Sequence, residues 1–281
     1  MANNALDLNN LRLAVLIDAE NVPRKCIKSV IEEIAIYGTP TVKRIYGDWT
    51  HPAQSGWKAS LLENAITPIQ QYSYTTGKNS SDSAMIIDAM DILYSEKTDG
   101  FVIVSSDSDF TRLAIRLREA GQRVIGIGER KTPNAFIAAC DKFTYIEVIR
   151  AGGEEALLER DAARAAAFDA QHDSDEGDAK QSNQSRDRHN YPSRTRGTKV
   201  HDQIENLIAD SVADLAGDDG VVFMGELGNL ILKKQPDFDH RNFGYKSLSA
   251  MIKSIDRFEI DFRQTADPNI KHVFVRDKEG N

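Results

Sequence analysis

Four aspartates stand where an α/β fold would gather them at one edge of its sheet. Asp18 ends one apolar run, Asp107 and Asp109 follow a second, and Asp82 opens a helix-like segment. Because like charges repel, carboxylates that converge in this way need a cation among them. A Mg²⁺ or Mn²⁺ ion that works on phosphate meets that need, so a metal-dependent nuclease is the first hypothesis.

Simpler roles are open to two polar residues of this set. Asp109 has the position of an N-cap for the helix that follows it, and Asn21 has the same relation to a later helix. Capping by Asp109 would leave Asp18 and Asp82 unexplained, so the metal site is favoured. For Asn21, capping remains an alternative to a hydrogen bond with a metal ligand, a water or the scissile phosphate.

Two cations lie near these acids in the sequence. Lys78 precedes the segment that Asp82 opens, and Arg112 follows Asp109 by about one helical turn. Each has the position to neutralise substrate phosphate, although solvated surface charge is an equal alternative. The histidines show no ligand spacing that indicates zinc. No serine–histidine or cysteine–histidine arrangement indicates covalent catalysis.

The elements that position these residues alternate in type over residues 11 to 150. Six apolar runs typical of strands are Leu13–Ile17, Val42–Tyr46, Ile66–Tyr72, Phe101–Val104, Val124–Ile127 and Tyr145–Val148. Helix-like stretches lie between them near 23–37, 54–65, 82–95, 109–120 and 133–140. This βαβ alternation predicts a doubly wound parallel sheet, in which ligands bind beyond the carboxyl ends of the strands.

The apolar positions of the 82–95 stretch predict how that helix packs. They form one stripe at helical spacing, made of Ala84, Ile87, Met90 and Leu93. The stripe is typical of an amphipathic helix.

Length and composition set broad limits. A chain of 281 residues with 41% apolar content can hold two modest domains with real cores. The net charge of -8 argues against a generally basic nucleic-acid binder, but local basic patches can still steer a polyanion. Cys26 and Cys140 lack metal-ligand spacing and are expected to be buried or half-buried free thiols. With no signal peptide or membrane-length apolar stretch in the sequence, we expect a soluble, cytoplasmic protein.

Residues 151–199 differ from the domain before them. A helical extension over 154–168 gives way to five acids and no base over 169–178, and then to six bases and one acid over 180–199. Large apolar residues are nearly absent there, so we predict a flexible linker. The alternative is that its cations, Arg186, Arg188, Arg194, Arg196 and Lys199, contact nucleic-acid phosphates.

Residues 200–281 predict a second, small α+β domain. Three amphipathic helices followed by two alternating strands are typical of a winged helix-turn-helix. Ten Lys and Arg stand against fifteen Asp and Glu over residues 201–281, which weakens any claim of strong duplex binding. The candidate nucleic-acid contacts flank the third helix and the wing, and they are Arg241, Tyr245, Lys246, Lys253 and Arg263.

The motifs of the N-terminal part resemble those of the NYN (LabA-like) domain family, a branch of the PIN-like and FLAP-nuclease group. The residues that carry the likeness are Ile17–Asn21, Arg44–Trp49, Lys78–Asp88 and Ser105–Phe110. The resemblance covers residues 11 to 148 and implies a Rossmann-like fold with metal-dependent cleavage of RNA. It implies that Asp18, Asp82, Asp107 and Asp109 are metal ligands, and Asn21 matches the asparagine beside the family's first aspartate.

The C-terminal part is similar to the OST-HTH (LOTUS) domain. The likeness is carried by Phe238–Leu248, Met251-Ile252 and Phe258–Ile260. It implies binding of RNA, which in some relatives is G-rich or folded, and of protein partners in others.

Together these patterns predict a Mg²⁺- or Mn²⁺-dependent ribonuclease, endonucleolytic in action, with a tethered RNA-binding domain. It would act on single-stranded or structured RNA. Two alternatives stay open at this point. The chain could be a non-catalytic RNA- or protein-binding adaptor, an interpretation that the acidity of the C-terminal domain favours. It could also transfer phosphate through Asp18, although no suitably placed later lysine is evident.

Overall fold

The computed structural model describes residues 11–72, 80–153, 202–217, 220–264 and 271–280. The helical extension and the linker predicted over 154–199 lie outside these residues, as does Lys78. None of the described helices combines the length and the apolar character needed to cross a bilayer.

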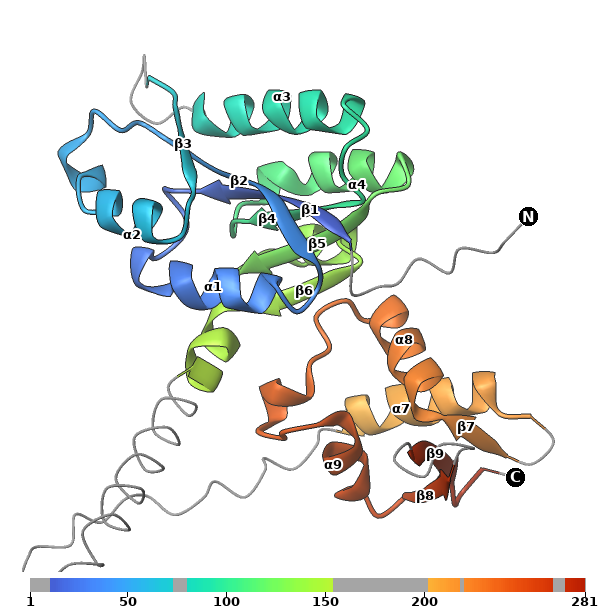
Figure 1. Cartoon of the computed structure of the whole chain (residues 1–281). Helices are drawn as coiled ribbons and strands as arrows, with labels where there is room; N and C mark the ends of the chain where they lie inside the picture. Colours follow the sequence, from blue (N-terminus) through green and yellow to red (C-terminus); the bar gives the residue numbers. More distant parts are fainter. Residues whose placement is uncertain (1–10, 73–79, 154–201, 218–219, 265–270, 281) are drawn as a thin grey trace, which may run out of the picture.

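The N-terminal domain is a parallel sheet with helices on both faces (Figure 1). Its strands are β1 (Arg12–Asp18), β2 (Thr39–Gly47), β3 (Thr67–Gln70), β4 (Gly100–Val104), β5 (Arg123–Gly128) and β6 (Lys142–Tyr145). Its helices are α1 (Ile27–Ile34), α2 (Trp57–Glu63), α3 (Ser80–Tyr94), α4 (Thr111–Glu119) and α5 (Asn134–Ala139). The predicted α/β class and parallel sheet are confirmed.

The order of the strands decides where a site can form. The sheet runs β3-β2-β1-β4-β5-β6, and all of its pairings are parallel. The chain therefore builds outward from β1 to one edge, returns to place β4 on the other side of β1, and builds outward again. The order reverses between β1 and β4, and in such sheets this is where ligands bind.

The alternation of β1 explains the two cores. Leu13, Val15 and Ile17 are fully buried in the cluster that contains residues of α1 and α2. Ala14 and Leu16 point to the other face and pack with residues of α3, α4 and α5. A strand buried on both faces reads as a continuous apolar run, which is why this element is evident in the sequence.

Two local predictions are wrong. The last strand is β6, at Lys142–Tyr145, and a helix over 146–153 occupies most of the predicted strand Tyr145–Val148. A short apolar run fits a buried helix turn as well as a strand, and Ile146, Val148 and Ile149 are indeed buried.

The stripe predicted for α3 is the second correction. Ile87 is 64% exposed, whereas Met85, Ala89 and Ile92 are buried against the sheet. Of the other predicted positions, Leu93 is buried and Ala84 and Met90 are partly buried against the same core, so only Ile87 departs from the stripe. The buried face also includes Ser81 at the start of the helix. The apolar residues of α3 lie on more than one side, so their spacing alone did not select the buried face.

The C-terminal domain packs three helices against a small antiparallel sheet. The helices are α7 (Asp202–Leu215), α8 (Met224–Lys234) and α9 (Leu248–Lys253), and the strands are β7 (Val221–Phe223), β8 (Phe258–Gln264) and β9 (Lys271–Asp277). The strand order is β7-β9-β8, so the predicted β8–β9 wing has β7 as a third strand.

Candidate active site

Asp18 is the buried anchor of the site, at the carboxyl end of β1. Asp18 is only 2% exposed, and its carboxylate accepts three hydrogen bonds. The donors are the Glu20 backbone N–H at 2.9 Å, Asn21 Nδ2 at 2.7 Å and Ser105 Oγ at 2.8 Å. These donors offset the cost of burying a charge and fix the direction in which the carboxylate points.

The segment after β4 brings two more carboxylates to the same edge. Ser105 Oγ, which donates to Asp18, also accepts from the Asp107 backbone N–H at 3.1 Å. The Asp107 side chain accepts from the Asp109 N–H at 2.9 Å and so caps the short 3-10 helix Ser108–Phe110. The capping role considered for Asp109 therefore belongs to Asp107, and the side chain of Asp109 is exposed.

Asp82, in the first turn of α3, completes the predicted set. Its pKa is raised to about 7, first by burial and then by repulsion from Asp18, Asp107, Glu20 and Asp109. The other three predicted acids therefore lie within electrostatic reach of Asp82. Such excess negative charge is what a divalent cation would offset.

Glu20 and Ser105 belong to this group but were not among the predicted site residues. Glu20 accepts a hydrogen bond from Ser81 Oγ at 3.0 Å, which connects the loop after β1 to the start of α3. Glu20 follows the buried strand β1 closely, and Ser105 follows β4. A position just after a buried strand is the same signal that identified Asp18 and Asp107. A serine in such a place is too common to be singled out.

Asn21 contacts the site and caps no helix. Its amide donates to Asp18, and no side chain caps the 3-10 helix Arg24–Cys26 that follows Pro23. Asn21 thus orients a candidate metal ligand, which resolves the alternative left open by the sequence.

The residues suit a hard divalent ion in donor type and in charge. Every candidate ligand offers carboxylate oxygen, which Mg²⁺ and Mn²⁺ prefer. Across the described ranges, no three His, Cys, Asp or Glu side chains are grouped so that they could hold a metal ion together. A Mg²⁺ ion bound through one or two carboxylates, with water as its other ligands, requires no such arrangement.

Two further acids near the sheet have structural partners. Asp88 on α3 accepts hydrogen bonds from Arg44 and from the Tyr46 hydroxyl, both on β2. Burial and then Asp88 raise the pKa of Tyr46. Asp48, just after β2, accepts from Gln70 Nε2 at 2.9 Å and from Thr50. These contacts hold α3 and the loop after β2 in place.

The cations predicted to bind nucleic acid have different surroundings. Arg112 is exposed in the first turn of α4, and Lys246 and Lys253 are exposed around α9. Tyr245 is half-buried, and its hydroxyl accepts a hydrogen bond from Ser254 Oγ at 2.8 Å. Arg241 is paired with the carboxylates of Glu33 and Asp239. The assignment of these residues to nucleic acid stays a prediction.

Arg263 lies on an aromatic face of the C-terminal sheet that the sequence did not reveal. Its guanidinium carbon is 4.5 Å from the centroid of the Phe274 ring. The rings of Phe223 and His272 are 5.2 Å apart, and that of Phe274 is 5.8 Å from Phe223. We call Phe223, His272, Phe274 and Arg263 the aromatic face. Open rings beside a cation are the surface on which single-stranded bases stack.

Comparisons with known proteins give the two domains their families. Residues 12–147 match the model of the NYN domain, and residues 197–270 match that of the OST-HTH/LOTUS domain. NYN domains are generally nucleases, and OST-HTH domains bind RNA. A search of curated proteins gave no match.

Among solved structures, the chain is similar to a protein of unknown function from Vibrio parahaemolyticus. The two are 20% identical with a TM-score of 0.43, over 52% of this chain and 96% of the other. It is also similar to an uncharacterized protein from Nitrosomonas europaea, with 27% identity and a TM-score of 0.26, over 37% of this chain and 95% of the other. The two family matches lead to one conclusion, that the chain is an NYN-domain protein with a C-terminal OST-HTH/LOTUS domain.

Proposed function

We propose that this protein is a divalent-metal-dependent endoribonuclease whose OST-HTH domain binds the RNA substrate. The observation that carries the proposal is the convergence of carboxylates at the β1–β4 reversal, where burial first and then repulsion from the neighbouring acids raise the pKa of Asp82 to about 7. An acidic site that is left unbalanced costs stability, so its presence needs a functional reason. Binding a cation that acts on phosphate supplies that reason.

Each residue of the site has a role in this proposal. One or two of Asp18, Asp82, Asp107 and Asp109 would bind Mg²⁺ or Mn²⁺ directly and the others through its waters, while Asn21 and Ser105 keep the Asp18 carboxylate in place by hydrogen bonding. The bound ion would lower the pKa of water and neutralise charge that builds up on the phosphate. Arg112, exposed in the first turn of α4, would contact the RNA backbone.

Changing Asp107 to Asn tests the assignment with little effect on the local fold. Asparagine is as good an N-cap as aspartate, so the 3-10 helix after it keeps its cap. We expect RNA cleavage to fall by about 1000-fold, the several kcal/mol expected from a metal ligand. The measurement is cleavage of labelled single-stranded and structured RNA with Mg²⁺ or Mn²⁺.

The adaptor alternative predicts a different result in the same assay. The wild-type chain would shift RNA in a gel without cleaving it at any metal concentration. Cleavage by the Asp107→Asn variant at the wild-type rate, with its fold intact by circular dichroism, would also refute the proposed site.

The aromatic face carries the second part of the proposal, which is RNA binding by the C-terminal domain. We expect Phe274→Ala to weaken the binding of single-stranded RNA by about ten- to a hundredfold, as loss of one stacking ring does elsewhere. Fluorescence anisotropy with a labelled RNA measures this effect. Phe262→Ala is the matched control, because Phe262 is 59% exposed on the same hairpin but alternates to the other side of the sheet. Equal affinity of the Phe274→Ala variant and the wild type would exclude this face.

A further inference from the structure

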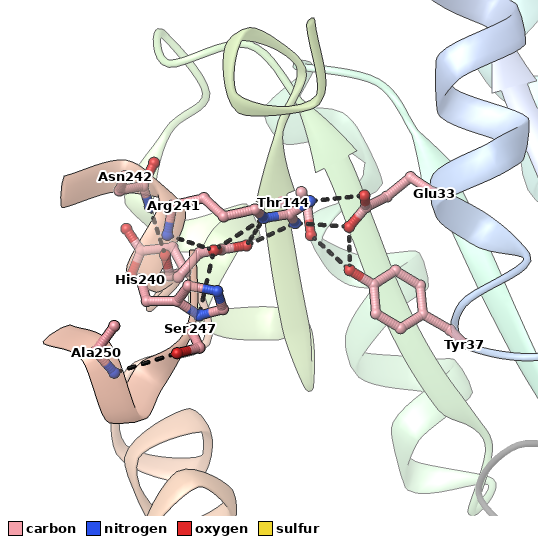
Figure 2. Close-up of polar contacts among 10 residues, drawn as sticks. Glu33, Tyr37, Thr144, His240, Arg241, Asn242, Ser247 and Ala250 are labelled. Atoms are coloured by element: carbon pink, nitrogen blue, oxygen red, sulfur yellow. Dashed lines mark hydrogen bonds and ion pairs between the residues drawn. The ribbon is translucent and has the colours of Figure 1, made fainter. Parts of the chain in front are cut away.

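An arginine of the C-terminal domain forms an ion pair with the N-terminal domain. Arg241 donates from Nη1 to Glu33 Oε2 at 2.8 Å and from Nη2 to Glu33 Oε1 at 2.7 Å, a two-pronged pairing across the domain boundary. The same guanidinium donates to Asp239 Oδ2 at 2.7 Å. Figure 2 shows this arrangement, with Glu33 on α1 facing the segment that carries Arg241. Glu33 and Asp239, which carry the two carboxylates, are each only 6% exposed.

The surroundings of this contact balance its charge. Burial raises the pKa of Glu33, but hydrogen bonds from Arg241 and Tyr37 outweigh that effect and leave the pKa below its usual value. Lys142 lies over the Tyr37 ring, 5.0 Å from its centroid, and supplies a second cation. The buried carboxylates of Glu33 and Asp239 are thus balanced by the two cations Arg241 and Lys142. Removing one member would leave a buried charge unpaired.

Contacts on either side extend the same boundary along β6. The Phe143 backbone N–H donates to the Pro236 carbonyl at 2.8 Å, and the Tyr145 hydroxyl donates to Asp237 Oδ2 at 2.7 Å. Arg130 stacks over the Tyr145 ring, with its guanidinium carbon 5.3 Å from the centroid. Hydrogen bonds and an ion cluster therefore hold the two domains in one orientation, whereas the Arg130–Tyr145 ring contact lies within the N-terminal domain.

One loop connects this boundary to the carboxylate site. Arg130 belongs to the loop that follows β5, at the same edge of the sheet as Asp107. The Glu129 backbone N–H in that loop donates to Ser106 Oγ at 2.8 Å, immediately before Asp107. Arg130 Nη2 donates to Asn242 Oδ1 of the C-terminal domain at 3.4 Å, so the docked domain contacts the loop that neighbours the acidic site.

We infer that Arg241 is a positioning residue, which clamps the OST-HTH domain to the N-terminal domain so that RNA held by one reaches the carboxylates of the other at a fixed spacing. This inference rests on the proposed ribonuclease function. In the docked state Nε, Nη1 and Nη2 of Arg241 all donate to carboxylates, so its guanidinium is occupied by protein and not by RNA phosphate.

The first measurement is the distance between the two domains, and it does not depend on RNA cleavage. Spin labels at Glu119→Cys on α4 and Ala213→Cys on α7 report the distance between the domains by pulsed electron paramagnetic resonance in the full chain. Both positions are exposed, while the native Cys26 and Cys140 are buried. We expect one narrow distance distribution, which broadens in Arg241→Ala and in Glu33→Ala. Lys234→Ala, which removes an ion pair with Asp214 inside the C-terminal domain, should leave it narrow.

The second measurement compares cleavage of a long RNA that spans both domains with cleavage of a short one that reaches only the carboxylate site. Arg241→Ala and Glu33→Ala should each lower kcat/KM for the long RNA by about tenfold, through loss of effective concentration. Both should leave cleavage of the short RNA unchanged. The double variant should lose no more than either single one, because the two residues act through one contact.

The possible results are distinct. A broad distribution in the wild type, or a narrow one in both variants, would overturn the clamp. So would normal cleavage of long RNA by Glu33→Ala beside a loss in Arg241→Ala, since that pattern means that Arg241 contacts RNA directly. A chain that cleaves no RNA with any divalent metal would refute the ribonuclease, whereas the distance result would still decide whether Arg241 fixes the domains.

Discussion

Changing Asp82 to Asn is expected to abolish RNA cleavage and yet make the metal-free protein more stable. The carboxylate is partly buried and repelled by four others, so its charge opposes folding when no cation is present. We expect the free energy of unfolding in EDTA at pH 8 to rise by about 1–2 kcal/mol, a modest value because solvent screens part of the repulsion. Cleavage should fall by about 1000-fold with the loss of a ligand.

The pH dependence of the Asp82 effect has a defined sign. The pKa of Asp82 is about 7 in the folded protein against 3.8 as its ordinary value, so the folded state favours the protonated form. The contribution of Asp82 to the free energy of unfolding is fully present below its ordinary pKa of 3.8 and is lost as the pH rises through its folded-state pKa of about 7. The difference between variant and wild type should therefore shrink from pH 8 towards pH 4 in urea unfolding series.

Asp88→Asn is the matched control for Asp82→Asn. It makes the same chemical change on the same helix, but it weakens contacts with Arg44 and Tyr46 and leaves the acidic site untouched. We expect this variant to be less stable than the wild type and to cleave RNA normally. If Asp82→Asn lowered stability in EDTA as Asp88→Asn does, the crowding of charge around Asp82 would be disproved.

Changing Asp18 to Asn is expected to cost both activity and stability. Both oxygens of the Asp18 carboxylate accept hydrogen bonds, and an amide offers only one acceptor. Either orientation of the amide turns an N–H₂ group towards at least one of the donors at Glu20, Asn21 and Ser105. We expect a loss of about 1–3 kcal/mol in the free energy of unfolding, from a buried donor left unsatisfied.

The activity of the Asp18→Asn variant should fall about as far as that of Asp82→Asn, because both residues are proposed ligands of one ion. Cleavage of labelled RNA and urea unfolding in EDTA measure the two effects separately. Asp48→Asn is the control, since Asp48 also follows a strand of the sheet and accepts hydrogen bonds from neighbours. Wild-type cleavage by the Asp18→Asn variant would remove Asp18 from the site.

The sequence predicted the edge of the sheet at which the acids meet, because that result depends on long, clear elements. The runs that became β1 and β4 are buried on both faces, so the positions of Asp18 and Asp107 at strand ends could be predicted. The reversal of strand order between β1 and β4 then follows from the doubly wound class. The short final strand β6 was misplaced, because a run as short as Tyr145–Val148 fits a helix as well as a strand.

The contacts of the boundary between the domains could not be predicted in the same way. Arg241 and Glu33 are 208 positions apart in the sequence, so no local spacing relates them. The pattern around Arg241 indicated only a cation near a helix, which is typical both of nucleic-acid contacts and of solvated charge. The hydrogen bond from Ser105 to Asp18 could not be predicted for the same reason, since it joins segments that only the completed sheet brings together.

The hydrogen bond from Phe143 to the Pro236 carbonyl has a consequence for self-association. β6 is an edge strand of the N-terminal sheet, and unpaired edges invite pairing with another chain. Proline accepts a hydrogen bond there but has no backbone N–H of its own, so it covers the edge without offering a ladder that a further strand could extend. The docked domain thereby occupies a backbone group of this edge that would otherwise be open to pairing with another chain.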